Sequence, residues 1–110
     1  MAKKPETVFN ERLRKKLNII PHSWFVKIQL IAICGIPDFL GVVNGRFVAL
    51  ELKKDANEKP KKLQMKVMHE ISRAGGLAFV VFPDNHLEVL KVLQHLSSGE
   101  VHNASPEPPH

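Results

Sequence analysis

The chain has 110 residues, 44% hydrophobic and 25% charged, which predicts one globular domain and leaves no room for a second. No apolar run approaches the roughly 18–20 residues of a membrane-spanning helix, and no hydrophobic stretch typical of a secretory signal follows the first residues. The single cysteine, Cys34, excludes an internal disulfide framework and favours a reducing, cytoplasmic setting. The net charge of +5 favours a polyanionic partner such as nucleic acid.

The N-terminal part predicts a helix followed by a strand. Residues 6–17 carry apolar side chains at four-residue spacing, which predicts an amphipathic helix with Pro5 near its start. The apolar stripe consists of Phe9, Leu13 and Leu17. Residues 24–33 are rich in β-formers and predict a first strand, in which Trp24 is expected to pack in the core or at the strand edge.

A β-hairpin is predicted next, with strands over 38–43 and 47–53. The two apolar stretches are joined by Asn44-Gly45, and Asn-Gly is the strongest short hairpin signal because a type I′ turn needs φ > 0 at both central residues. Pro37 has no N–H for a sheet ladder, so it belongs at a strand start or edge.

Another helix and strand follow. Residues 54–62 are charged and predict a loop that leads into a helix ending near Ala74, where Gly75-Gly76 supplies the stop. The core stripe expected for this helix is Leu63, Val67 and Ile71. Residues 77–82 form a continuous apolar run, as expected of a strand buried on both faces.

The C-terminal part predicts a last helix capped by Asp84 and then a disordered tail. The helix stripe is Leu87, Leu90, Leu93 and Leu96. We therefore expect a domain over residues 1–97 and a tail over 98–110. The element order αβββαβα predicts an α/β fold, in which a helical crossover returns the fourth strand parallel to a hairpin strand in a mixed sheet covered by helices on both faces.

The hairpin register predicts where the acidic side chains meet. If Val43 pairs with Arg46, counting back along both strands puts Asp38 directly opposite Glu51, with Cβ atoms roughly 4.5–5.5 Å apart. Two carboxylates held so close repel each other unless a cation lies between them, and a hard divalent cation with oxygen ligands fits best. Lys53 points to the same face because strand side chains alternate.

These residues lie within four stretches that resemble one nuclease family: Gly35–Gly41, Asn44–Lys53, Gln64 and Arg73–Val81. The pattern Pro37-Asp38 with Glu51-Leu52-Lys53 resembles the PD-(D/E)XK nuclease superfamily, and the longer stretches resemble its VRR-NUC family over about residues 6–90. The resemblance implies a restriction-endonuclease-like αβββαβα core. VRR-NUC members occur in phages and bacteria, often as stand-alone domains, and in a eukaryotic structure-specific repair nuclease.

The resemblance implies Mg²⁺- or Mn²⁺-dependent hydrolysis of phosphodiester bonds in DNA, with selectivity for branched, flap or junction DNA and a homodimer as further possibilities. It assigns Asp38, Glu51 and the Leu52 carbonyl as metal ligands and Lys53 as the catalytic lysine. Glu6 corresponds to the acid of the first helix, as a further metal ligand. Gln64 corresponds to the polar residue of the second helix, and both are candidate catalytic residues. Cys34 departs from the family, which often has a basic residue at that position.

The basic cluster beside the motif predicts DNA contacts, and Lys54, Lys61, Lys62 and Arg46 are the candidates. Each site residue also has an ordinary alternative: a turn residue for Asp38, surface decoration for Glu51, and a helix-dipole interaction for Glu6. The lysines are equally compatible with a solvated surface. A non-cleaving nucleic-acid-binding module, or a binding subunit of a larger assembly, is the alternative function.

Overall fold

The computed structural model describes residues 4–28, 35–55 and 57–99, without the side chains of Pro5 and Glu6. The elements in chain order are α1 (Pro5–Asn18), β1 (Ser23–Lys27), β2 (Phe39–Val43), β3 (Arg46–Leu52), α2 (Lys62–Arg73), β4 (Leu77–Val81) and α3 (His86–Ser98). The predicted order αβββαβα and the α/β class are confirmed. Within the described residues, no helix is both long enough and apolar enough to cross a membrane.

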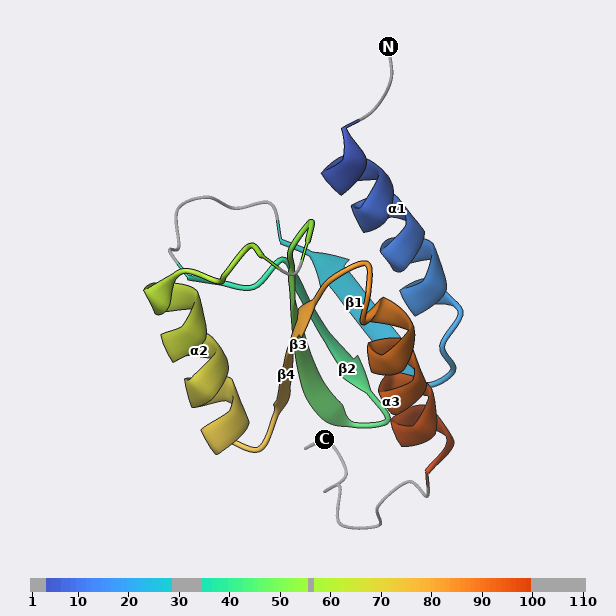
Figure 1. Cartoon of the computed structure of the whole chain (residues 1–110). Coiled ribbons are helices and arrows are strands. Elements are labelled where there is room, and N and C mark those ends of the chain that lie inside the picture. The colour runs from blue at the N-terminus through green and yellow to red at the C-terminus, as the bar shows by residue number, and fades with distance from the viewer. Residues whose placement is uncertain (1–3, 29–34, 56, 100–110) are drawn as a thin grey trace.

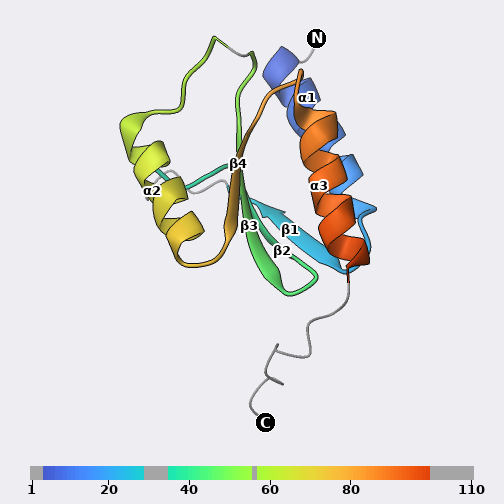
Figure 2. The same ribbon diagram turned by 60° about the horizontal axis from the view of Figure 1, so that its bottom comes forward.

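The four strands form one mixed sheet in the order β1-β2-β3-β4. β2 pairs antiparallel with both β1 and β3, and β4 returns parallel to β3, as the crossover predicted. Helices α1 and α3 cover one face of the sheet and α2 lies on the other (Figures 1 and 2). This arrangement is compatible with a restriction-endonuclease-like core, and it brings the ends of β3 and β4 together near the start of α2 (Figure 1).

Strand β3 divides its side chains between the two faces. Val48, Leu50 and Leu52 point into the hydrophobic core that α1 and α3 close, together with Leu13 and Phe39. Because side chains alternate along a strand, Glu51 points to the opposite face, where α2 lies. The core therefore fixes β3 in register and leaves its one acidic side chain on the α2 side of the sheet.

The hairpin turn is the type I′ turn that the sequence predicts. Asn44 and Gly45 have φ angles of +49° and +84°, and Val43 pairs with Arg46. The Asn44 side chain also donates hydrogen bonds to the carbonyl oxygens of Leu96 and Gly99, which ties the turn to the end of α3.

Several predicted boundaries are wrong. The first strand runs over Ser23–Lys27, because its partner β2 begins only at Phe39, opposite Lys27. Residues 29–33 of the predicted strand, and Cys34 after it, lie outside the described residues. The last helix is capped by Asn85 and not by Asp84. The Asn85 side chain bonds to backbone atoms of Val80 and Phe82, so it closes the turn after β4.

The boundary of the tail also differs. α3 extends through Ser98, one residue into the predicted tail. The Ser97 hydroxyl is buried and donates to the Pro21 carbonyl, which holds this end of the helix against the loop after α1. Residues 100–110 lie outside the described part of the chain.

Burial departs from the sequence prediction at the sheet edges. β4 is not buried on both faces: only Val81 is fully buried, since β4 is an edge strand. Trp24 is 64% exposed on the other edge strand, so its predicted core position is wrong and its strand-edge position is correct. The helix stripes are partly wrong too, because Leu63 and Leu87, at the starts of α2 and α3, are exposed.

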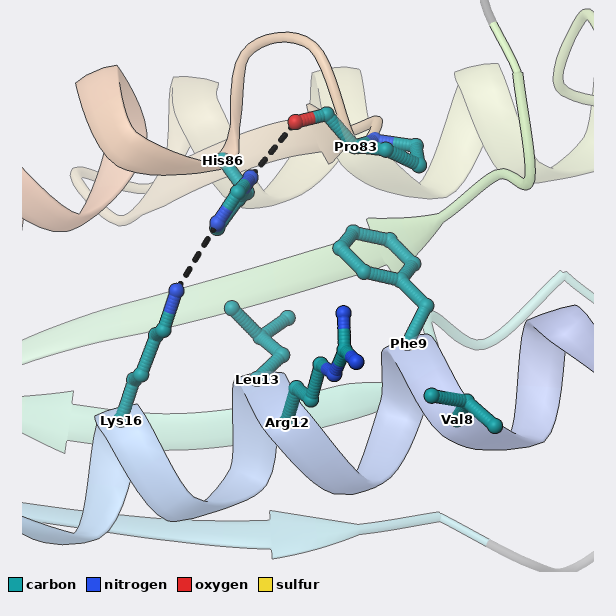
Figure 3. Close-up of a pocket in the computed structure, with 7 residues that line it drawn as sticks. All are labelled: Val8, Phe9, Arg12, Leu13, Lys16, Pro83 and His86. Atoms are coloured by element: carbon teal, nitrogen blue, oxygen red, sulfur yellow. Dashed lines mark hydrogen bonds between the residues drawn. The ribbon is translucent and has the colours of Figure 1, made fainter.

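Two cavities that share Phe9 lie beside the start of α1. One, of about 200 Å³, lies where β2 and β3 end. The other, of about 550 Å³, lies between α1 and the turn that precedes α3 (Figure 3). Phe9 lines both cavities, which are therefore neighbours.

Candidate metal centre

Glu51 is a buried carboxylate near the end of β3. Its residue is only 3% exposed, which agrees with the prediction that this acid lies within an apolar strand. Oε2 accepts a hydrogen bond from Gln64 Nε2 at 2.8 Å and pairs with Lys53 Nζ at 3.2 Å. The second oxygen, Oε1, is buried and has no hydrogen-bond partner among the described residues. An orphaned carboxylate oxygen of this kind is unfavourable unless a cation or water satisfies it.

Gln64, in the first turn of α2, holds Glu51 and Lys53 in place. Its Oε1 accepts from the Lys61 backbone N–H at 3.0 Å and from Lys53 Nζ at 3.4 Å, while Nε2 donates to Glu51. The amide orientation follows from these partners, because only oxygen can accept from an N–H. The predicted contact between Gln64 and the lysine is therefore present, and it joins the first turn of α2 to the residue that follows β3.

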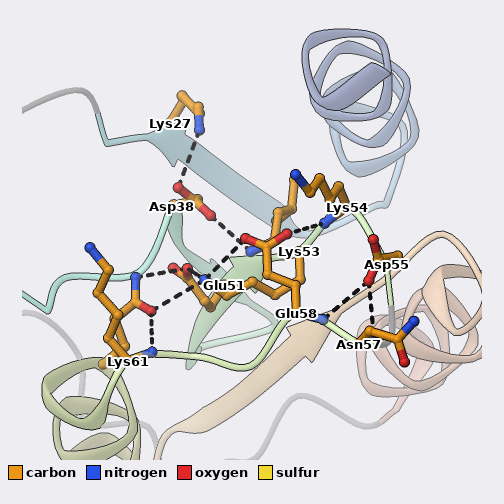
Figure 4. A network of polar contacts seen from close by, with 11 residues as sticks. Lys27, Asp38, Glu51, Lys53, Lys54, Asp55, Asn57, Glu58 and Lys61 are labelled. Atoms are coloured by element: carbon orange, nitrogen blue, oxygen red, sulfur yellow. Dashed lines mark hydrogen bonds and ion pairs between the residues drawn. The ribbon is translucent and has the colours of Figure 1, made fainter. Parts of the chain in front are cut away.

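Asp38 lies just before β2, one position beyond the last regular pair, Phe39 with Leu50. Its Oδ2 accepts the backbone N–H of Leu52 at 2.8 Å, and its Oδ1 pairs with Lys27 Nζ at 3.5 Å. This hydrogen bond takes the place of the next backbone hydrogen bond between β2 and β3. It holds the aspartate beside the end of β3 (Figure 4).

The Leu52 carbonyl points to the same side as Asp38. The Lys53 N–H bonds to the Val81 carbonyl on β4, and in a trans peptide the carbonyl of the same unit points the opposite way. Continuing the hairpin register would put Pro37 opposite Leu52, and proline has no N–H to donate to this oxygen. The backbone thus presents a third oxygen beside the two carboxylates.

Burial raises the pKa of the Glu51 carboxyl above its ordinary value of 4.5, and repulsion from Asp38 raises it further. The hydrogen bond and charge of Lys53 oppose both effects without cancelling them. The carboxylate pair expected from the hairpin register is therefore close enough to interact. A positive charge between these two groups would relieve both unfavourable effects.

The remaining predicted residues divide into two groups. Lys54 lines the cavity of about 200 Å³ together with Asp38 and Lys53, and Lys61 and Lys62 are exposed where α2 begins. Arg46 lies at the other end of β3, and its Nε donates to the Gly75 carbonyl at 3.1 Å. The structure therefore does not bring Arg46 to the site.

Glu6 lies in the first turn of α1, and its side chain is outside the described part of the structure. Its predicted role as a further metal ligand stays a prediction.

Two charged residues at the site were missed by sequence reasoning. Lys27 reaches Asp38 from β1, and its Nζ also lies 5.2 Å from the centre of the Phe39 ring. Glu58, in the loop before α2, lies 3.8 Å from Lys53 Nζ and accepts from the Lys54 backbone N–H. Register reasoning from a tight turn could not find Lys27, because β1 and β2 are not joined by one, and Glu58 lies in a loop without periodicity.

The donor set suits a hard cation of small size. Within the described residues, no three His, Cys, Asp or Glu side chains converge as a complete metal site. Asp38, Glu51 and the Leu52 carbonyl provide oxygen donors only, and Mg²⁺ keeps several waters, so it needs few protein ligands. The orphaned Glu51 Oε1 and the repulsion between the carboxylates both favour such an ion. The residues present therefore fit the metal that the resemblance implies.

A scan against protein-family models finds no matching family, and a search of curated proteins finds no match. The site must therefore be interpreted from its own geometry.

Proposed function

We propose that this chain is a Mg²⁺- or Mn²⁺-dependent DNA endonuclease of the VRR-NUC type. The observation that carries the proposal is the buried Glu51 carboxylate, which has one oxygen without a partner in the described structure and stands close to a second carboxylate. A protein that only bound DNA would gain nothing from this unfavourable pair. A nuclease gains a cation site next to a lysine.

In this proposal Asp38, Glu51 and the Leu52 carbonyl hold the metal. A divalent cation bound there would polarise the scissile phosphate and lower the pKa of the attacking water. Lys53, held by Glu51 at 3.2 Å and by Glu58 at 3.8 Å, acts as a cation that stabilises negative charge developing on the phosphate. Gln64 acts as a positioning residue for both Glu51 and Lys53.

The basic side chains around the cavity would hold the DNA backbone. Lys54 lines the cavity, and Lys61 and Lys62 are exposed at the nearby start of α2. Lysines at such positions contact phosphates without reading the sequence of the DNA. We leave Arg46 out of the proposed contacts because it lies at the far end of β3.

Nicking of supercoiled plasmid tests the proposal directly. The wild-type protein should nick with Mg²⁺ or Mn²⁺ and not with EDTA. Asp38→Asn and Lys53→Met should each lower the rate by about 10²-fold or more, because each removes a charge that acts on the transition state. Glu70→Gln, a change at an exposed position on α2, should cleave like the wild type.

Nicking that survives Asp38→Asn would show that the activity belongs to another site or to a contaminant. DNA binding without cleavage under any metal condition would favour the non-cleaving binding module instead.

Substrate structure and assembly belong to the same proposal. We propose selectivity for branched, flap or junction DNA, which cleavage of synthetic forks, four-way junctions and plain duplexes would measure. A homodimer would suit paired cuts at a two-fold symmetric junction, and sedimentation of the protein with and without DNA tests it. The cytoplasmic location expected from the single cysteine stays a prediction.

A further inference from the structure

The larger of the two cavities, about 550 Å³, is not explained by the metal centre. It lies between one face of α1 and the turn that joins β4 to α3 (Figure 3). Its volume falls within the range of about 300–1,000 Å³ that is typical of small-molecule sites.

Two cations line this cavity. Arg12 and Lys16 are one turn apart on α1 and both border it, and no carboxylate is among its described lining residues. Arg12 forms no ion pair with any described residue. The cavity therefore carries uncompensated positive charge, which favours an anionic ligand.

A histidine orients one of the cations. His86 Nδ1 lies 2.6 Å from the Pro83 carbonyl oxygen, and His86 Nε2 lies 3.0 Å from Lys16 Nζ. The carbonyl can only accept and the ammonium can only donate, so Nδ1 donates to Pro83 and Nε2 accepts from Lys16. This chain of hydrogen bonds uses one of the three Lys16 donors and leaves the other two for a ligand (Figure 3).

The rest of the cavity wall is apolar and partly aromatic. Val8, Phe9 and Pro83 line it, and the Phe9 ring stands edge-on to the His86 ring at 5.9 Å and 83°. A flat heteroaromatic group can pack on such a wall, while an anionic group on the same ligand reaches the cations of α1. A nucleotide combines these two parts.

The position of the cavity suggests the source of the nucleotide. Phe9 also lines the smaller cavity, which Asp38 and Lys53 border, so the two cavities are neighbours at this residue. We propose that the larger cavity binds one nucleotide of the DNA strand next to the cleaved phosphate, with its base against Phe9 and Pro83 and its phosphate on Arg12 and Lys16. This inference rests on the proposed nuclease function. A free mononucleotide has the same chemistry, so the experiment distinguishes the two sources.

Binding can be measured without cleavage by two-dimensional NMR of the ¹⁵N-labelled full chain in EDTA. Titration with deoxyadenosine 5′-monophosphate and with a single-stranded eight-nucleotide DNA should shift the amide signals of Phe9, Lys16 and His86 in a saturable way. Deoxyadenosine and inorganic phosphate, each lacking half of the ligand, should bind more weakly than the mononucleotide.

The double substitution Arg12→Gln/Lys16→Gln should weaken binding of both ligands by about tenfold or more, because two charge-assisted hydrogen-bond donors are lost. Lys15→Gln is the matched control: it removes one charge from the same helix at an exposed position outside the cavity, and binding should change little. Thermal unfolding of the variants checks that each is folded.

Absence of shifts at Phe9, Lys16 and His86 with both ligands would overturn the inference, as would wild-type affinity in the folded double variant. Either result leaves plasmid nicking, and hence the proposed function, intact. If the protein bound these ligands in the cavity but never cleaved DNA, that result would contradict the nuclease proposal. It would also contradict the proposal that the bound nucleotide belongs to a DNA strand. An affinity for the mononucleotide equal to that for the eight-nucleotide DNA would overturn the strand as the source in favour of the free nucleotide.

Discussion

A buried carboxylate at the end of β3 makes the metal-free protein sensitive to pH. Burial and Asp38 raise the pKa of Glu51 above 4.5, so the folded state holds this proton more tightly than the unfolded state does. The stability gained in this way is fully present below about pH 4.5 and is lost as the pH rises through the raised pKa in the folded protein.

Glu51→Gln removes this pH dependence. In EDTA the variant should be more stable than the wild type at pH 7, and the difference should shrink as the pH falls toward 4.5, the ordinary value for this carboxyl. Urea unfolding of both proteins across this pH range measures the difference. Mn²⁺ should stabilise the wild type against unfolding, and this stabilisation should be absent in the variant. A variant that is less stable than the wild type at pH 7 in EDTA would contradict the unfavourable burial.

Lys27 would compete with the proposed metal for Asp38. Its Nζ lies 3.5 Å from Asp38 Oδ1, so it neutralises the carboxylate from within the protein. Lys27→Gln should tighten Mn²⁺ binding by roughly three- to tenfold, because one nearby positive charge near a protein surface is worth about 1 kcal/mol. Calorimetric titration with Mn²⁺ measures the affinity, and Lys91→Gln, exposed on α3, serves as the control. Weaker Mn²⁺ binding by Lys27→Gln would show that the metal does not sit beside Asp38.

At the scale of elements, the β2–β3 hairpin sets the geometry of the site, since its register determines which residues stand opposite each other at the far end. Gly45 has φ +84°, a conformation that costs an L-residue about 1–2 kcal/mol. Gly45→Ala should lower the free energy of unfolding by that amount. Chemical denaturation measures it.

Gly99→Ala is the matched control for the turn. Gly99 has φ −68° and an added Cβ would meet no atom closer than 3.4 Å, so alanine is accommodated there. Equal destabilisation by the two substitutions would show that the positive φ angle at position 45 does not cause the loss of stability in Gly45→Ala.

At the scale of the whole molecule, positive charge is placed around one end of the sheet. Lys54, Lys61 and Lys62 lie near the candidate metal centre, whereas Arg46 lies at the opposite end of β3. Each lysine that contacts a phosphate should contribute about one unit to the slope of log affinity against log salt.

Substitution of each lysine by glutamine should therefore flatten the salt dependence of DNA binding by about one unit, and Arg46→Gln should leave it unchanged. Fluorescence anisotropy with a duplex at several salt concentrations, in EDTA, measures the slopes. An unchanged slope in all three lysine variants would place the DNA elsewhere on the molecule.

Local sequence was sufficient for the hairpin and for the carboxylate pair. Asn44-Gly45 fixes the turn, and the turn fixes the register of β2 and β3. That register places Asp38 opposite Glu51, only a few residues from the turn on each strand. The burial of side chains on the edge strands of the sheet was not predictable from local sequence. Residues 77–82 read as a strand covered on both faces, but β4 is an edge strand, and position in a sheet is a property of the whole topology.

By itself, the sequence determined the order of the elements, the turn and the presence of two opposed acids, because these depend on backbone preferences and on periodicity along a few residues. Tertiary structure alone decided that Lys27 faces Asp38, that Gln64 bridges Glu51 and Lys53, and that α1 and the turn before α3 enclose a basic cavity. Those contacts join residues from separate elements, and their distances depend on how helices pack on the sheet, which no local pattern encodes.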